Sequence, residues 1–276
     1  MRLRPAAFAL LVCSIFSANA ADRRVDIGGR KLFLQCSDKV KTGPTVILIA
    51  GGGGTTEAWS RVQPAVSKFA RVCSYDYAGL GHSDAIKGRQ TALGFVTDLR
   101  ALLQAADLPK PYVLAGHSFG GLYARMLSAQ IPNDIAGMVL IDSSHEEQIW
   151  RMAKASTTLQ EREWGPNWNK PEIMKHLGFY PPGEQSTWHL DVPLIVIEHG
   201  RNLPNPFAPR PGNVIDHKEF RRIEDAWHEL QVDLAGRSKF GELREAAHSD
   251  HPVPFQQPKI IVEAIRDVLA RIADKH

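Results

Sequence analysis

The sequence lacks the features that would place it outside ordinary globular proteins. Lys and Arg number 33 against 30 for Asp and Glu, so the formal net charge is only +3. No basic tract favours a nucleic-acid partner, and there is no internal repeat or low-complexity tract. The 276 residues, 43% of them hydrophobic, are enough for one α/β domain whose core needs no further crosslink for stability.

The chain also lacks an N-terminal apolar run of membrane-spanning length. Residues 6–16 are apolar but too few to span a bilayer. They follow the basic residues Arg2 and Arg4 and precede Ala18-Asn19-Ala20, which is the pattern of a secretory signal peptide. We therefore expect residues 1–20 to be a signal peptide and the mature chain, 21–276, to be periplasmic or secreted without stable membrane insertion.

Two other interpretations of this segment stay open, an uncleaved membrane anchor and a lipoprotein. Cys13 is the residue a lipoprotein would use, but the bulky Val12 stands where a small residue is needed. We favour cleavage after Ala20.

Cysteine is scarce, with three residues in the whole chain. Cys13 is lost with the signal peptide, which leaves Cys36 and Cys73 in an oxidising compartment. They are candidates for a disulfide, and two buried free thiols are the alternative.

What the sequence does contain is a regular alternation of buried strands and amphipathic helices. This order is typical of the α/β class, in which a mostly parallel, doubly wound sheet carries helices on both faces. The expected strands are an opening hairpin over 25–35 and the runs 45–49, 71–75, 111–115, 135–141, 192–197 and 242–247; the expected helices are 58–69, 91–106, 122–130, 220–234 and 258–272.

One long segment, residues 143–190, interrupts this alternation. Segments of this length between strands are usually functional or folded in their own right. We predict a helical cap over the functional site, and an insertion without such a role is the alternative. The segment is rich in aromatic residues: Trp150, Trp164, Trp168, Phe179, Tyr180 and Trp188.

The strongest motif is Gly116-His117-Ser118-Phe119-Gly120, between an expected strand and an expected helix. A strand, Gly-x-Ser-x-Gly and a helix form a nucleophile elbow, a turn so sharp that the serine backbone is strained and its hydroxyl is exposed. Larger side chains at Gly116 and Gly120 would collide with the neighbouring strand and helix. We therefore predict Ser118 as the nucleophile.

A serine hydroxyl needs a base, and this elbow usually takes it from a loop after the last strand. His248 and His251 are both candidates. The segment from Ser249 to Gln257-Pro258 resembles the end of α/β-hydrolase superfamily chains, where a histidine is followed by an apolar stretch, Gln-Pro and the final helix. This resemblance covers nearly the whole mature chain and favours His251, with His248 placed inside the last strand as a structural residue.

The resemblance leaves the acid of the triad open. Most members carry it a few residues after the second-to-last strand, where this chain has Leu203. Some members use an acid at the end of the preceding strand instead, and Asp142 is placed for that role. Asp142 is our first choice, Glu198 the second and Asp216 the third.

The oxyanion of an acyl transfer needs main-chain donors. The elbow implies the amide of Phe119, and the resemblance implies Gly52 in the glycine run that follows residues 45–49. Ala50 replaces the usual histidine there, which weakens local anchoring. The run lacks the following Lys-Ser/Thr of a phosphate loop.

Two further expectations follow from the resemblance. In this fold the strand ending near Cys36 neighbours the strand carrying Cys73, which favours the disulfide. The segment from Asp76 to Asp84 is similar to a structural loop of the family, so Asp76 and His82 are given no catalytic role.

The predicted activity is serine hydrolysis of an ester-type bond in a small or medium apolar substrate, with no metal or organic cofactor. C–C bond hydrolases, peptidases and perhydrolases share the same triad and stay open. A non-catalytic binding member of the fold is the alternative from a different class.

Overall fold

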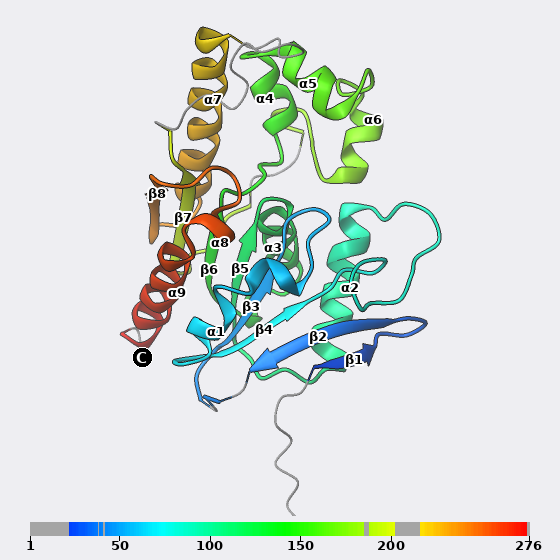
Figure 1. Cartoon of the computed structure of the whole chain (residues 1–276), viewed down its shortest axis with the longest axis vertical. Helices are drawn as coiled ribbons and strands as arrows, with labels where there is room; N and C mark the ends of the chain where they lie inside the picture. Colours follow the sequence, from blue (N-terminus) through cyan, green and yellow to red (C-terminus); the bar gives the residue numbers. More distant parts are fainter. Residues whose placement is uncertain (1–21, 38, 41, 185–187, 202–215, 275–276) are drawn as a thin grey trace, which may run out of the picture.

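The computed structural model describes residues 22–37, 39–40, 42–184, 188–201 and 216–274 (Figure 1). The predicted signal peptide, residues 1–20, lies outside this part of the chain. Within the described ranges, no helix combines the length and the apolar character needed to cross a bilayer.

A mostly parallel sheet forms the centre of the fold (Figure 1). Over the described residues it has eight strands in the order β1-β2-β4-β3-β5-β6-β7-β8. The opening hairpin is confirmed: β1 and β2 are antiparallel, and β2 is also antiparallel to β4, whereas all later pairs are parallel. The strands are β1 (Arg23–Asp26), β2 (Lys31–Ser37), β3 (Thr45–Ile49), β4 (Arg71–Tyr75), β5 (Tyr112–His117), β6 (Ile135–Ile141), β7 (Leu194–His199) and β8 (Gly241–Ala246).

Helices cover both faces of the sheet and also lie above its carboxyl edge (Figure 1). Around the sheet they are η1 (Thr56–Trp59), α1 (Gln63–Val66), α2 (Ala92–Ala105), α3 (Phe119–Gln130), η2 (Pro132–Asp134), α7 (His217–Ala235), α8 (Val253–Gln256) and α9 (Pro258–Ala273). Between β6 and β7 they are α4 (Gln148–Ala153), α5 (Thr157–Trp164), α6 (Pro171–Met174) and η3 (Lys175–Leu177).

Strand β3 shows how the sheet generates two cores. All five of its residues are buried, as expected for a strand with helices on both faces. Because side chains alternate along a strand, Ile47 and Ile49 pack with α2 and α3, and Val46 and Leu48 pack with α1 and α9. The α/β class predicted from the sequence is therefore confirmed.

The helix predicted over 58–69 is wrong as a continuous element. The structure has η1, a short turn and then α1 in its place. Pro64 explains the break, because it has no amide hydrogen to donate to the preceding turn and can only stand in the first turn of a new helix.

The disulfide between Cys36 and Cys73 is present in the structure. The two residues lie directly opposite each other on the antiparallel strands β2 and β4, with 4.1 Å between their α-carbons. Cys73 is level with Ile47 of β3, which is in turn level with Leu114 of β5. The bridge is therefore two strands away from β5 and well before the end of that strand, where Ser118 follows.

Reduction of this bridge should lower the melting temperature far more than the activity at room temperature. The sequence separation of 37 residues corresponds to about 4 kcal/mol in the chain-entropy model, or about 10 °C for a chain of this size. The measurement is calorimetry of reduced, alkylated protein beside protein that was alkylated without reduction. Two free thiols in the denatured, unreduced chain would contradict the bridge.

Candidate active site

Ser118 occupies the sharp turn between β5 and α3. Its φ of 53° and ψ of −124° are unfavourable for a residue with a side chain, and such strain persists only where the surroundings impose it. Here the Ser118 amide donates to Ile141 O (3.0 Å), and its carbonyl accepts from the amides of Gly121 (3.0 Å) and Ser144 (3.0 Å). The turn is thus held from both β6 and α3.

The glycines around Ser118 are required by close main-chain contacts. A Cβ at Gly116 would lie 2.4 Å from the carbonyl oxygen of Gly120, and one at Gly120 would lie 2.1 Å from that of Ile49. Backbone atoms cannot yield as side-chain ends do. This confirms the steric reason given above for the two glycines of the motif.

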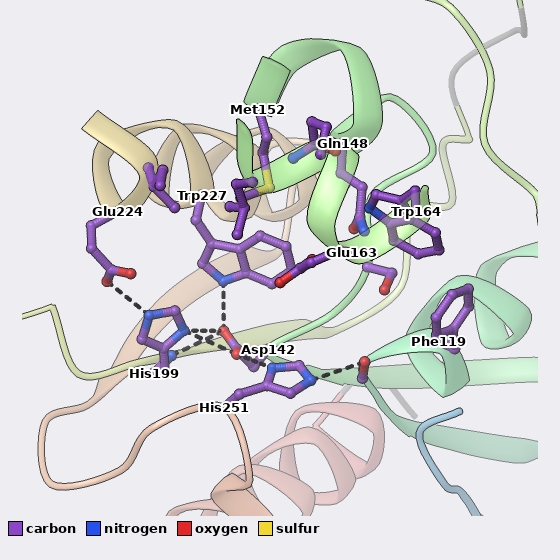
Figure 2. A pocket seen from close by; sticks show the side chains of 15 residues that line it. Phe119, Asp142, Gln148, Met152, Glu163, Trp164, His199, Glu224, Trp227 and His251 are labelled. Atoms are coloured by element: carbon purple, nitrogen blue, oxygen red, sulfur yellow. Dashed lines mark hydrogen bonds and ion pairs between the residues drawn. The ribbon is translucent and has the colours of Figure 1, made fainter. Parts of the chain in front are cut away.

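His251 lies beside Ser118 in the loop between β8 and α8. Its Nε2 is 3.0 Å from Ser118 Oγ, and its Nδ1 is 2.6 Å from Asp142 Oδ2 (Figure 2). The side chains of two glutamines hold this loop: Gln256 accepts from the Asp250 amide (2.7 Å) and Gln257 from the His248 amide (3.0 Å). The glutamines of the segment that resembles the family therefore hold the loop that carries His251.

The alternative histidine, His248, is exposed and lies beyond the end of β8, which stops at Ala246. The prediction that His248 lies inside the last strand is wrong, because the strand ends two residues earlier. A different histidine, His117, supports the loop, since its Nε2 donates to the carbonyl of His251 over 2.8 Å. Burial lowers the pKa of His117 to about 4, so its ring is neutral at pH 7. Sequence reasoning assigned no role to His117.

Asp142 follows β6 and is fully buried, with a φ of 40°. Its Oδ1 accepts from Trp227 Nε1 (2.7 Å) and from the amide of His199 (3.1 Å). His199 Nδ1 is 2.9 Å from both carboxylate oxygens. Burial opposes ionisation of Asp142, but the contacts with His199 and His251 outweigh it and hold the pKa well below its usual range.

The structure does not bring the two alternative acids to His251. Glu198 pairs with His228, whose Nδ1 is 2.7 Å from Glu198 Oε2. Asp216 caps the start of α7 by accepting from the amide of Glu219 over 2.7 Å. Leu203, at the more usual position of the acid, lies outside the described residues.

No role was predicted for His199 from the sequence, but the structure places it against Asp142. Its Nδ1 faces Asp142, and its Nε2 is 2.8 Å from Glu224 Oε2 (Figure 2). Burial alone would lower the pKa of His199, but the two carboxylates raise it to about 10. The sequence offered one indication of His199: it lies at the end of the region of the expected strand 192–197, where β7 ends, and it directly follows Glu198, one of the candidate acids.

The glycine loop after β3 lies against the nucleophile turn. A Cβ on Gly51 would be 3.0 Å from His117 Nδ1, and one on Gly52 would be 3.0 Å from the ring of Phe119. Gly54 N donates to Gly51 O over 3.0 Å and closes the loop. The amides of Gly52 and Phe119, the expected oxyanion donors, are thus on segments in contact. Phe119 is the first residue of α3, where amides have no partner within the helix.

Two neighbouring residues explain how this loop is anchored without the usual histidine. Tyr77 Oη donates to the carbonyl of Ala50 over 2.6 Å. Asp76 is buried and accepts from the amides of Thr56 (2.7 Å) and His82 (2.8 Å). These are structural contacts, and they tie the loop after β4 to the loop after β3.

A cavity of about 410 Å³ opens above Ser118, between the sheet and the helices that follow β6 (Figure 2). Of the six aromatic residues predicted to form the cap, Trp164 lines this cavity, and Phe179 packs behind it against Trp164 and Phe119. Helix α7, outside the predicted cap, also contributes to the wall. The lining residues are Ser118, Phe119, Asp142, Ser144, Gln148, Met152, Leu159, Gln160, Glu163, Trp164, His199, Ile223, Glu224, Trp227 and His251.

Buried ion pairs attach Glu146, at the start of the segment predicted to form a cap, to Arg125 and Arg237. Arg125 of α3 contacts Glu146 (3.0 Å) and the carbonyl of Ser144 (2.9 Å), and Arg237 also pairs with Glu146. Burial opposes ionisation of Glu146, but Arg125, His145 and Arg237 lower its pKa to about 2.

In the described part of the chain, no group of three or more His, Cys, Asp or Glu residues is arranged to hold a metal ion.

Comparison with known proteins agrees with this architecture. Residues 44–178 match the family model described as alpha/beta hydrolase fold. Uncharacterized protein YqjL of Bacillus subtilis is 26% identical over an alignment of 250 residues, and the match covers 83% of this chain and 85% of that protein. An AB hydrolase superfamily protein of Gibberella zeae is 30% identical over 125 residues, but the match spans only 39% of its length.

Two solved structures share the fold at low identity. A thermophilic esterase from Thermogutta terrifontis superposes with a TM-score of 0.61 at 19% identity, covering 92% of this chain and 99% of that one. Alpha/beta hydrolase domain-containing protein 10 from mouse superposes with a TM-score of 0.65 at 16% sequence identity. The superposition covers 92% of this chain and 100% of the mouse protein. The chain therefore has the α/β-hydrolase fold, and this fold supports a hydrolase in general.

The raised pKa of His199 makes stability depend on pH. The unfolded chain releases this proton near pH 6.5 and the folded chain near pH 10. The contribution of His199 to the free energy of unfolding is therefore complete below pH 6.5 and declines above it, by up to about 1.4 kcal/mol per pH unit. Urea denaturation of wild type and His199→Asn at pH 6, 7, 8 and 9 measures this slope. Parallel curves for the two proteins would contradict the assignment.

Proposed function

We propose that the protein is a serine hydrolase that cleaves an ester-type bond of a small or medium apolar substrate through an acyl-enzyme. The observation that carries this proposal is the continuous chain Ser118 Oγ–His251 Nε2 (3.0 Å) and His251 Nδ1–Asp142 Oδ2 (2.6 Å). A serine, a histidine and a carboxylate in this order are the parts that activate a hydroxyl for attack on a carbonyl.

In the first half of the proposed reaction, Ser118 Oγ attacks the ester carbonyl and gives its proton to His251 Nε2. The amides of Gly52 and Phe119 stabilise the oxyanion. His251 then donates the proton to the leaving alcohol, and the acyl group stays on Ser118. In the second half, water attacks the acyl-enzyme, His251 takes its proton, and the carboxylic acid leaves as Ser118 is restored.

The cavity supports the substrate class. Its volume suits one small ligand, and apolar side chains from four helices, α3, α4, α5 and α7, supply much of its wall. They are Phe119, Met152, Leu159, Trp164, Ile223 and Trp227. The polar residues Gln148, Gln160 and Glu163 also reach it, so a modest polar group on the substrate is compatible with the site.

We also infer that the protein is exported. The disulfide between Cys36 and Cys73 supports an oxidising compartment, and the N-terminal pattern of residues 1–20 supports a cleaved signal peptide. Edman sequencing of the mature protein, beginning at Ala21, is the direct test.

Ser118→Ala should remove nearly all hydrolysis of 4-nitrophenyl esters, with a loss in kcat on the order of a millionfold. Wild type should also react with a fluorophosphonate probe, and the variant should not. Turnover should be highest for short and medium acyl chains because of the cavity volume. A variant that keeps a tenth of the activity would exclude Ser118, and a wild type that neither turns over nor labels would favour a non-catalytic member of the fold.

Matched pairs of variants test the other two members of the triad. Asp142→Asn should reduce kcat by about 10⁴-fold while the protein stays folded, because the tautomer of His251 is no longer fixed. Glu198→Gln should be mild. His251→Ala should abolish turnover, and His248→Ala should leave most of it. If Glu198→Gln or His248→Ala proves the crippling change, the assignment of that member is wrong.

A further inference from the structure

The carboxylate of Asp142 has more partners than orienting one histidine requires. One oxygen, Oδ2, faces His251 Nδ1 at 2.6 Å. The other, Oδ1, accepts from Trp227 Nε1 and from the amide of His199, and the His199 ring spans both oxygens. Donors from the end of β7 and from α7 therefore fix the plane of the carboxylate before His251 is considered.

The His199 ring lies between two carboxylates. Asp142 is on its Nδ1 side at 2.9 Å and Glu224 is on its Nε2 side at 2.8 Å (Figure 2). A neutral imidazole has one donor and one acceptor nitrogen, so it would direct a lone pair at one of these carboxylates. Both nitrogens are donors only in the imidazolium form. The geometry thus defines a partly buried cation that Glu224 holds against Asp142.

This arrangement sets the charge that His251 faces. Asp142, His199 and Glu224 together carry one net negative charge, whereas Asp142 and Glu224 alone would carry two. When His251 takes the proton of Ser118 it becomes an imidazolium, which a net negative charge stabilises. The positive charge of His199 reduces this stabilisation, and the negative charge of Glu224 restores part of it.

Resting on the serine-hydrolase function proposed above, we propose that His199, held by Glu224, is a positioning residue. It keeps Asp142 ionised and oriented, and it sets the pH range over which His251 serves as a base. His199 does not touch the reacting atoms and acts through Asp142.

The other charged groups around the site are unchanged in the His199 and Glu224 variants considered below. His117 packs against His251 with ring centroids 4.8 Å apart. Glu163 of α5 interacts electrostatically with His251. Glu224 also lines a surface pocket with four charged residues, and Glu198 on β7 is paired with His228. The four are Arg201, Arg221, Asp225 and Glu245.

Two substitutions, His199→Asn and Glu224→Gln, should displace the acid limb of the kcat/KM profile in opposite directions. His199→Asn keeps a donor on the side of Asp142 but removes the cation, so His251 is protonated more easily and the limb moves to higher pH. Glu224→Gln removes the outer carboxylate, so the limb moves to lower pH. Each displacement should be about 0.5–1 pH unit, because Asp142 lies between His199 and His251, Asp142 and His199 lie between Glu224 and His251, and the His251 side chain is half exposed.

The matched control is Glu198→Gln, which removes a carboxylate from the residue next to His199 and should move neither limb. His199→Ala should lower kcat more than His199→Asn, because it also removes the donor to Asp142. Displacements in the same direction, or none, in folded His199→Asn and Glu224→Gln would show that the cluster is only structural.

A second readout separates this inference from the proposed hydrolysis. In the Ser118→Ala background, imidazole NMR signals report the protonation of His199 and His251 without turnover. We expect His199 to stay protonated at pH 8. The pH midpoint of the His251 titration should rise in His199→Asn and fall in Glu224→Gln. A neutral His199 at pH 7 would overturn the inference whether or not wild type hydrolyses esters. Failure of esters and probe alone, with these signals as expected, would overturn only the proposed function.

Discussion

A buried carboxylate beside the serine is the constraint on which the rest of the site depends. Asp142 has no exposed surface, and an ionised carboxylate away from water is costly unless charges and donors surround it. The chain supplies them from three directions, with His199 at the end of β7, Trp227 on α7 and His251 after β8. The site is therefore organised around the acid as much as around the serine.

The fold was largely predictable because its central strands are buried on both faces. The bounds 45–49, 71–75 and 135–141 agree with β3, β4 and β6. Strands β3 and β6 are almost entirely apolar, which is typical of strands covered on both faces. Helical periodicity failed at 58–69, where Pro64 overrides it. Its missing amide hydrogen is a stronger determinant than the apolar spacing around it.

Candidate residues with a local sequence signature were found more easily than those defined by contacts. Gly116 and the glutamines near His251 contact residues a few positions away, and Gly120 belongs to the same short motif as Gly116, so the sequence displays them. The partners of Asp142 are 57 and 85 residues away along the chain, on elements whose rotation about the sheet fixes which side chain points inward. For this reason three acids stayed open from the sequence, and His199 and Trp227 were missed.

The three residues beside the cavity differ in how firmly the chain holds them. Ser118 and Asp142 follow the adjacent strands β5 and β6, and main-chain bonds join their turns, so they move as one body. His251 comes from a loop, and half of its side chain is exposed. We expect warming to loosen this loop before the sheet melts, so that the contact between His251 and Ser118 is lost while the protein is still folded. A more heat-tolerant form therefore requires a stiffer segment between β8 and α9, not a denser core.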